Sequence, residues 1–82
     1  MNNSFYNDFA ARFAAGTLTS LVESFNSQVG NRGFNSARAA YDQALIDELV
    51  RRGIDVSAVF DGTTISFAHY VELANNSLVI KK

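Results

Sequence analysis

Residues 56–67 read VSAVFDGTTISF, and apolar side chains recur at every second position on both sides of Asp61-Gly62. An Asp-Gly pair between two such runs is a strong signal for a two-residue β-hairpin, because a type I′ turn requires positive φ at both central positions. Folding the chain at this pair places Phe60 opposite Thr63. This part of the chain is therefore predicted to form antiparallel strands.

Asn75-Asn76 supplies a second two-residue turn, which places Leu73 opposite Leu78. Counting by twos through both turns gathers most large apolar side chains on one face and small or polar side chains on the other. A slip of one residue destroys this separation, so the pattern specifies the register. We predict a three-stranded antiparallel meander, with a short helix over 66–74 as the alternative to its middle strand.

Residues 4–28 have the apolar spacing of a helix, since Phe5, Phe9 and Phe13 recur every four residues. Gly16 weakens the middle of this segment, because Gly costs about 1 kcal/mol relative to Ala in a helix interior. We predict one helix here, with a bend or a break at Gly16 as the alternative.

Residues 37–52 carry a second helical stripe of apolar side chains. The stripe ends at Gly53, which suits the left-handed residue that follows many helices. Ile54 can then contact Leu49, as the Schellman motif prefers. Two helices followed by three strands predict a single α+β domain of order ααβββ over residues 1–82, with both helices packed on the apolar face of the sheet.

The composition limits the possible functions. The chain has 82 residues, of which 48% are hydrophobic and 18% are charged, and its formal net charge is −1. These values argue against a disordered chain and against a strongly electrostatic binder of nucleic acid or membranes. The chain has no Cys and one His, which excludes disulfides, thiolate metal sites and multi-His metal sites, so we expect no cofactor and no metal. Because no leader or membrane-spanning pattern is present, we expect a cytoplasmic protein.

The segment 30–36 is the clearest loop, because two Gly residues flank an Arg ahead of a helix N-terminus. Free backbone N–H groups and the helix dipole attract anions there, and Arg32 and Arg38 add positive charge. We predict Arg32, Phe34 and Arg38 as secondary binding residues. The alternative is an ordinary connection in which Phe34 packs and Arg32 stays in solvent, and the spacing is not that of a Walker loop.

Catalytic chemistry has little support in the sequence. His69 falls on the apolar face of the predicted sheet, where we expect it to be partly buried. The carboxylates are scattered, and the spacing pairs Arg38 with Asp42 and Asp47 with Arg51 as ordinary pairs on a helix surface. We therefore expect that the protein is not an enzyme.

The remaining candidates are association surfaces. The solvent-facing side of the predicted sheet carries Val59, Tyr70 and Val79 among small residues, and the strand over 55–60 has neither Pro nor Lys to protect its edge. We predict a protein-binding module of adaptor or inhibitor type, which binds another protein or a second copy of itself, as a homodimer, through this face or edge. Small acidic domains without Cys suit such roles, including those of mobile-element accessory proteins.

A nucleic-acid-binding regulator is the second hypothesis. If the first helix breaks at Gly16, the order of three helices and a hairpin resembles that of a winged helix-turn-helix, with 37–52 as the recognition helix. The resemblance is one of element order alone. That helix mixes acidic with basic residues, and Asp61 at the wing tip repels phosphate. Neither nucleic acid nor a membrane is therefore the expected partner.

Overall fold

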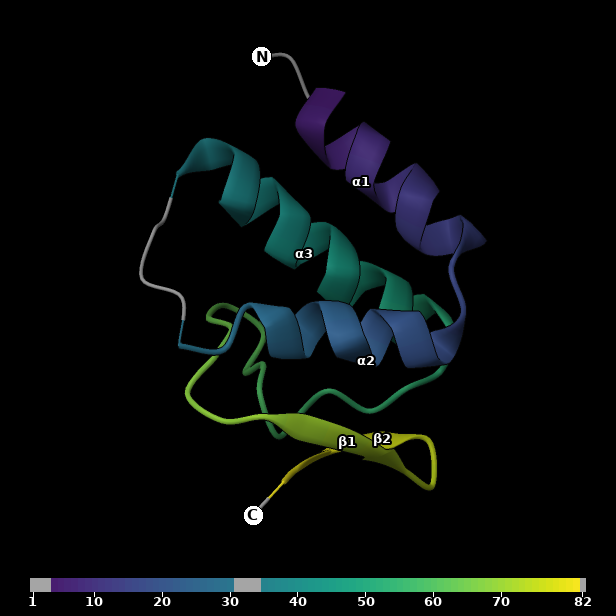
Figure 1. The fold of residues 1–82 in the computed structure, drawn as a ribbon, viewed down its shortest axis with the longest axis vertical. Helices are drawn as coiled ribbons and strands as arrows, with labels where there is room; N and C mark the ends of the chain where they lie inside the picture. The colour runs from purple at the N-terminus through teal and green to yellow at the C-terminus, as the bar shows by residue number, and fades with distance from the viewer. Residues whose placement is uncertain (1–3, 31–34, 82) are drawn as a thin grey trace.

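The structure of the chain is a computed structural model, which describes residues 4–30 and 35–81. Within these residues it contains three helices and a two-stranded antiparallel sheet, so the fold is α+β. The elements in chain order are α1 (Ser4–Ala15), α2 (Leu18–Ser27), α3 (Ser36–Arg51), β1 (Val71–Ala74) and β2 (Ser77–Ile80). Figure 1 shows α1 against α3, and α2 between α3 and the hairpin of β1 and β2.

The first predicted helix is two helices, because the chain leaves the helical path after α1. Thr17 has an extended backbone, with φ of −80° and ψ of 159°, and its side-chain oxygen accepts a hydrogen bond from the Ser20 N–H at 3.1 Å. Thr17 thus caps the N-terminus of α2. A Cβ on Gly16 would lie 2.9 Å from the Ser20 Oγ, so the lack of a side chain lets the two helices meet this closely. The prediction of one continuous helix is wrong, and the alternative of a break at Gly16 is confirmed.

The end of α3 has the predicted Schellman motif. Gly53 has a φ of +81°, and the Ile54 N–H donates a hydrogen bond to the Leu49 carbonyl at 2.9 Å. At the other end, the Asn35 side chain accepts a hydrogen bond from the Arg38 N–H at 2.9 Å. Asn is a favoured N-cap residue and Gly is favoured just after a helix end, so Asn35 and Gly53 stabilise the two ends of α3.

The hairpin of β1 and β2 has the predicted turn and register. Asn75 and Asn76 have φ values of 52° and 62°, and a type I′ turn requires both to be positive. Asn tolerates this left-handed region because its short polar side chain bonds the local backbone. Leu73 lies opposite Leu78, as predicted. The alternative of a short helix over 66–74 is wrong, because this segment contains β1.

The third predicted strand is absent from the part of the chain that the structure describes. The segment that follows α3 meets the sheet at one parallel bridge, between Asp55 and Ser77. Beyond this bridge the chain turns over 56–60, and the Phe60 N–H donates to the Val56 carbonyl at 2.9 Å. A turn cannot supply the ladder of hydrogen bonds that a strand makes. The prediction of a three-stranded meander is therefore wrong.

The turn at Asp61 is wider than predicted. The Asp61 carboxylate accepts hydrogen bonds from the N–H groups of Thr63 and Thr64, each at 2.8 Å. Phe60 pairs with Ile65 rather than with Thr63. An Asp side chain that bonds the backbone two and three residues further along replaces the tight type I′ geometry with a longer loop.

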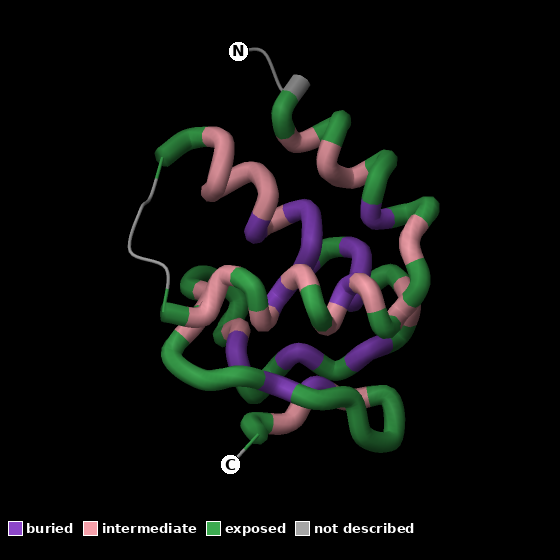
Figure 2. Tube along the Cα trace, viewed as in Figure 1, coloured by how far each residue is buried: buried purple, intermediate pink, exposed green. Residues whose placement is uncertain are grey.

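The core lies between α2, α3 and the segments that lead to the hairpin, and Figure 2 shows the buried stretches gathered there. Its members among the described residues are Phe13, Leu21, Phe25, Ala44, Leu45, Ile46, Leu49, Ile54, Val56, Val59, Val71 and Leu78. α2 is the helix that covers the apolar face of the sheet, whereas α3 packs against α2 (Figure 1). The prediction that both helices lie on the sheet therefore holds for α2 and is corrected for α3.

Candidate functional site

The hairpin has one face turned to the interior and one turned to solvent. Val71 and Leu78 face the interior and are buried. Because side chains alternate along a strand, Tyr70 and Val79 point to the opposite face. Tyr70 is 56% exposed, and Val79 is partly exposed. The structure thus brings two of the predicted binding residues together on one solvent-facing surface.

This surface continues the β-ladder beyond the ends of the strands. The Lys81 N–H donates to the Tyr70 carbonyl at 2.8 Å, so these two residues lie opposite each other. Glu72 lies opposite Val79, and Tyr70 is therefore a diagonal neighbour of Val79. We define the outer face of the hairpin as Tyr70, Glu72, Val79 and Lys81. It presents one aromatic and one aliphatic side chain beside one charge of each sign.

Two more large apolar side chains of the hairpin reach solvent, at opposite corners of the interior face. Leu73 is 40% exposed and Ile80 is 39% exposed, although the register places them beside the buried Leu78 and Val71. The diagonal formed by Val71 and Leu78 is covered, with α2 packed on β1, and the other diagonal is uncovered. Sequence reasoning missed this exposure, because strand alternation alone assigns all four side chains to the core.

Each edge of the two-stranded sheet is blocked at one point. On the β1 edge, the Asn26 side chain donates to the Val71 carbonyl at 3.0 Å and accepts from the Val71 N–H at 2.8 Å. On the β2 edge, the Asp55 N–H donates to the Asn76 carbonyl at 2.8 Å, and the Leu78 N–H donates to the Asp55 carbonyl at 2.9 Å. An incoming strand needs unpaired edge groups, so the face is more available than the edge. The edge predicted to bind belongs to a strand that does not form.

Val59 and the loop between α2 and α3 are not part of this surface. Val59 is buried in the core, so its predicted place on a solvent-facing strand is wrong. The turn over 56–60 directs Val56 and Val59 to the same side, which strand alternation would not do. Arg32 and Phe34 lie outside the described residues.

Arg38 is turned toward the protein. Its guanidinium lies 5.6 Å from the centroid of the Phe67 ring and donates to the Gln28 carbonyl at 3.2 Å. Its Nε lies 3.5 Å from Oδ2 of the buried Asp42. Burial raises the pKa of Asp42 above its ordinary value, and the charge of Arg38 opposes this effect. The predicted surface pair is therefore a buried pair, and Arg38 joins α3 to α2 and to Phe67.

The second predicted ion pair forms with a different acid. Arg51 donates to Glu48 through Nε at 3.1 Å and Nη2 at 2.6 Å, and Arg52 donates through Nε at 2.7 Å. Glu48 lies three and four residues before these cations on α3, so one carboxylate reaches both. The hydrogen bonds from Arg51 are the main reason that the pKa of Glu48 lies below its ordinary value. Asp47, predicted to pair with Arg51, accepts a hydrogen bond from the Tyr6 hydroxyl instead.

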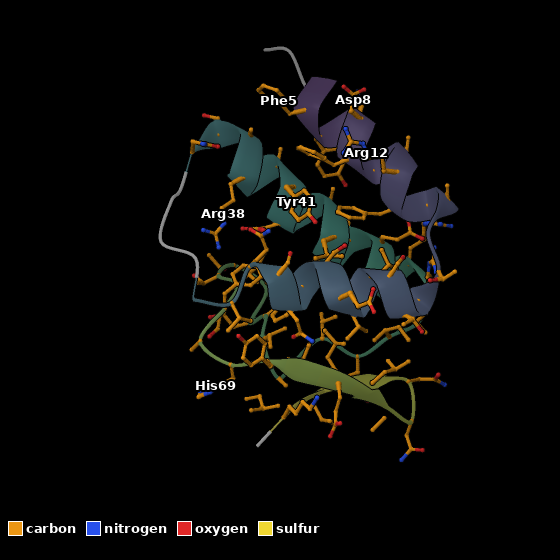
Figure 3. The ribbon with its side chains drawn as sticks, in the orientation of Figure 1. Phe5, Asp8, Arg12, Arg38, Tyr41 and His69 are labelled. Carbon is orange, nitrogen blue, oxygen red and sulfur yellow. The ribbon has the colours of Figure 1, made fainter. Side chains whose placement is uncertain are left out.

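His69 is exposed, so its predicted burial on the apolar face is wrong. Figure 3 shows its side chain pointing away from the helices. The strand that was expected to bury it begins only at Val71. Among the described residues, no group of three or more His, Cys, Asp or Glu side chains gathers in a way that could hold a metal ion.

A groove of about 330 Å³ runs between α1 and α3. Four alanines and four residues with polar side chains line it. The lining residues are Tyr6, Ala10, Ala11, Ala14, Ala44, Asp47, Glu48 and Arg51. The alanine side chains are too short to fill the space between the two helices. The sequence analysis did not predict this groove, because it depends on how α1 and α3 pack against each other.

No protein-family model matches the chain, and no curated protein or solved structure matches it either. None of the helices in residues 4–30 and 35–81 is long and apolar enough to cross a membrane.

Proposed function

We propose that the protein is a non-enzymatic protein-binding module and that the outer face of the hairpin is its docking surface. The observation that carries this proposal is Tyr70, an aromatic side chain that is 56% exposed on a regular β-ladder, diagonal to Val79. Tyr is enriched in protein interfaces because it combines a large apolar ring with one hydroxyl. The uncovered Leu73 and Ile80 add apolar area at the corners of the same hairpin.

The polar residues of the outer face support a protein partner. Glu72 and Lys81 flank the apolar pair, and many protein interfaces have an apolar centre with a polar rim. One charge of each sign favours a complementary protein surface over a polyanion such as nucleic acid. The partner is another protein or a second copy of this chain, and the face is more available to it because each edge is blocked at one point.

One observation favours a nucleic-acid-binding regulator, namely the order of three helices followed by a hairpin. In a winged helix-turn-helix, α3 would enter the major groove of DNA. In this fold α3 is the central helix, with α1 and α2 against it (Figure 1), and Arg38 faces Phe67. Protein binding is therefore better supported. Fluorescence anisotropy of a labelled DNA duplex at low salt separates the two hypotheses, because a regulator would bind with an affinity that falls steeply with salt.

Photo-cross-linking tests the proposed docking surface in cells of the protein's own host. The photo-reactive residue p-benzoylphenylalanine replaces Tyr70 in the full chain. The control places it at Val50 on α3, which is 52% exposed and therefore similarly accessible. We expect a discrete cross-linked species from position 70 that is absent from position 50, and its added mass distinguishes a second copy from another protein. The same species from both positions, or none from position 70, would contradict the proposal.

A further inference from the structure

α1 contributes less to the core than the other helices do. Twelve buried hydrophobic side chains form the core of the described residues, and Phe13 is the member that α1 supplies. The others come from α2, α3, the segment 54–59 and the hairpin. Figure 1 shows α1 on the outside of the molecule, against α3 and away from the hairpin. Tyr6, Phe9 and Ala10 of α1 pack against this core, and eleven of its twelve members lie outside α1.

The interface between α1 and α3 is packed on one side and open on the other. Phe9 and Phe13 each meet the Tyr41 ring edge-on, with ring centroids 5.1 Å apart. The alanine-lined groove of about 330 Å³ occupies the other side. Side chains that face open space lose the dispersion contacts that close packing provides. Apolar packing thus holds α1 from one side.

Arg52 makes a polar connection across this interface. From the end of α3, its Nη2 donates to the Phe13 carbonyl at 3.0 Å and to the Gly16 carbonyl at 2.7 Å. The last carbonyls of a helix lack intrahelical partners and form the negative end of the helix dipole, so a cation is favoured there. Glu48 accepts from the Nε of the same guanidinium and so orients it.

The connection between α1 and α2 permits a hinge. In the backbone, Gly16 donates to the Phe13 carbonyl at the end of α1, and Thr17 accepts from Leu21 at the start of α2. The last of these backbone hydrogen bonds at the end of α1 involves Gly16, and the first at the start of α2 involves the next residue, Thr17. α1 can rotate about this link while its own bonds and those of α2 stay intact.

We propose that α1 opens from α3 as a unit, with Gly16-Thr17 as the hinge and Arg52 as the residue that holds it closed. The open form exposes the side of α3 that carries Tyr41 and Ala44, while α2, α3 and the hairpin stay packed. Local opening of this kind takes less free energy than global unfolding. The device is independent of the proposed docking surface, because α1 lies away from the hairpin (Figure 1).

Native-state hydrogen exchange of the full chain tests this proposal. In the unmodified protein, the Phe13 amide should exchange faster than the Leu45 and Leu49 amides. Arg52→Ala should accelerate exchange throughout α1 by about tenfold or more, because hydrogen bonds to a charged group are among the stronger ones in proteins. Exchange in the α3 core should change less.

Arg51→Ala is the matched control. Arg51 lines the groove and bonds the same Glu48 carboxylate, but its hydrogen bonds stay within α3 and its side chain is 65% exposed, so its loss should leave α1 closed. Equal protection of α1 and the α3 core in the unmodified protein would overturn the proposal, because α1 would then open only with the whole fold. The assignment to Arg52 would be overturned if Arg52→Ala accelerated all amides equally or if Arg51→Ala had the same effect on α1.

Discussion

The two sides of α3 are packed by different means. Toward α2 and the hairpin, α3 shares a core in which Leu45 and Leu49 are fully buried. Toward α1, it relies on the edge-on contacts of Tyr41, an open groove and the polar contacts of Tyr6 and Arg52. Many small dispersion contacts add up in a closed core, whereas water can replace polar bonds across a partly open interface. The two neighbours of α3 are therefore held by different kinds of contact, although α1 packs on α3 more extensively than α2 does, and the proposed docking surface lies on the side of α2.

The largest effect is expected on the side of α2. Phe25 is fully buried, and its ring centroid lies 4.7 Å from that of Phe67. Phe25→Ala should lower the free energy of unfolding by about 3–5 kcal/mol, because it removes a large core side chain and leaves a cavity. Phe9→Ala, at the interface of α1, should cost less because Phe9 is half-buried. Urea denaturation measures both variants, and equal losses would remove the difference between the two sides.

A smaller effect is expected where α2 meets the edge of the sheet. Asn26→Ala removes both hydrogen bonds to the Val71 backbone and leaves its N–H and carbonyl without these partners. We expect a loss of about 1–3 kcal/mol in the free energy of unfolding. Ser27→Ala is the control, because this neighbouring hydroxyl makes an exposed bond within α2. Thermal denaturation compares the two, and a neutral Asn26→Ala would show that the blocked edge does not stabilise the fold.

The pH dependence of stability should depend on Glu48. Its pKa is lowered chiefly by the hydrogen bonds from Arg51, so its ionised form stabilises the fold above the unfolded-state pKa of about 4.5. This contribution is lost as pH falls through the lower pKa of the folded state. Glu48→Gln should therefore reduce the loss of stability below about pH 4.5. Urea denaturation at a series of pH values measures this slope.

Other carboxylates also contribute to the pH dependence of stability. Backbone N–H groups of Ser57 and Thr64 lower the pKa values of Asp55 and Asp61, so acid should still weaken the Glu48→Gln variant. Asp42 has the opposite effect on the pH dependence of stability. Burial raises its pKa, so its contribution to the free energy of unfolding is lost as pH rises. Parallel pH profiles for the unmodified protein and the variant would show that Glu48 does not couple protonation to folding.

The smallest effect on stability is expected at Tyr6, which lines the groove between α1 and α3. Tyr6→Phe keeps the ring but removes the hydroxyl that donates to Asp47. This hydrogen bond is exposed, so we expect a loss of about 1 kcal/mol or less in the free energy of unfolding. Hydrogen exchange should accelerate at Ala10 in α1 and stay unchanged at Leu49 in α3. If Tyr6→Phe lowered the free energy of unfolding as much as Asn26→Ala does, the two sides of α3 would not differ in stability.

The C-terminal hairpin and the end of α3 could be predicted because short-range chemistry determines them. Asn75 and Asn76 tolerate positive φ, and Gly53 suits the left-handed position after a helix. The break at Gly16 is an alternative that the sequence predicts, and the capping side chain of Thr17 stabilises the new helix start. In each case, residues within a few positions of one another supply the necessary hydrogen bonds.

The segment 54–67 could not be predicted in the same way. Alternation assigned Val56 and Val59 to opposite faces, but a turn at their spacing of three residues buries both. The Asp61 carboxylate bonds two backbone N–H groups and widens the loop that was predicted as a tight turn. These outcomes depend on side chains that bond the backbone and on burial against α2 and α3, which periodicity does not measure.

The candidate site was predictable in part. Tyr70 and Val79 share a face because the register of β1 and β2 follows from the turn. The exposure of Leu73 and Ile80 depends on how much of the sheet α2 covers, which is a tertiary property. The alanine groove has the same origin, because it depends on how α1 and α3 pack against each other.

The difference between the two sides of α3 is tested most directly by ¹⁹F NMR of the full chain labelled with 3-fluorotyrosine. The chain has three Tyr residues, of which Tyr6 and Tyr41 report on the interface of α1 and Tyr70 reports on the hairpin. We expect rising urea to remove the native Tyr6 resonance at a lower concentration than the native Tyr70 resonance. A single urea midpoint for all three resonances would show that the two sides of α3 do not differ in stability.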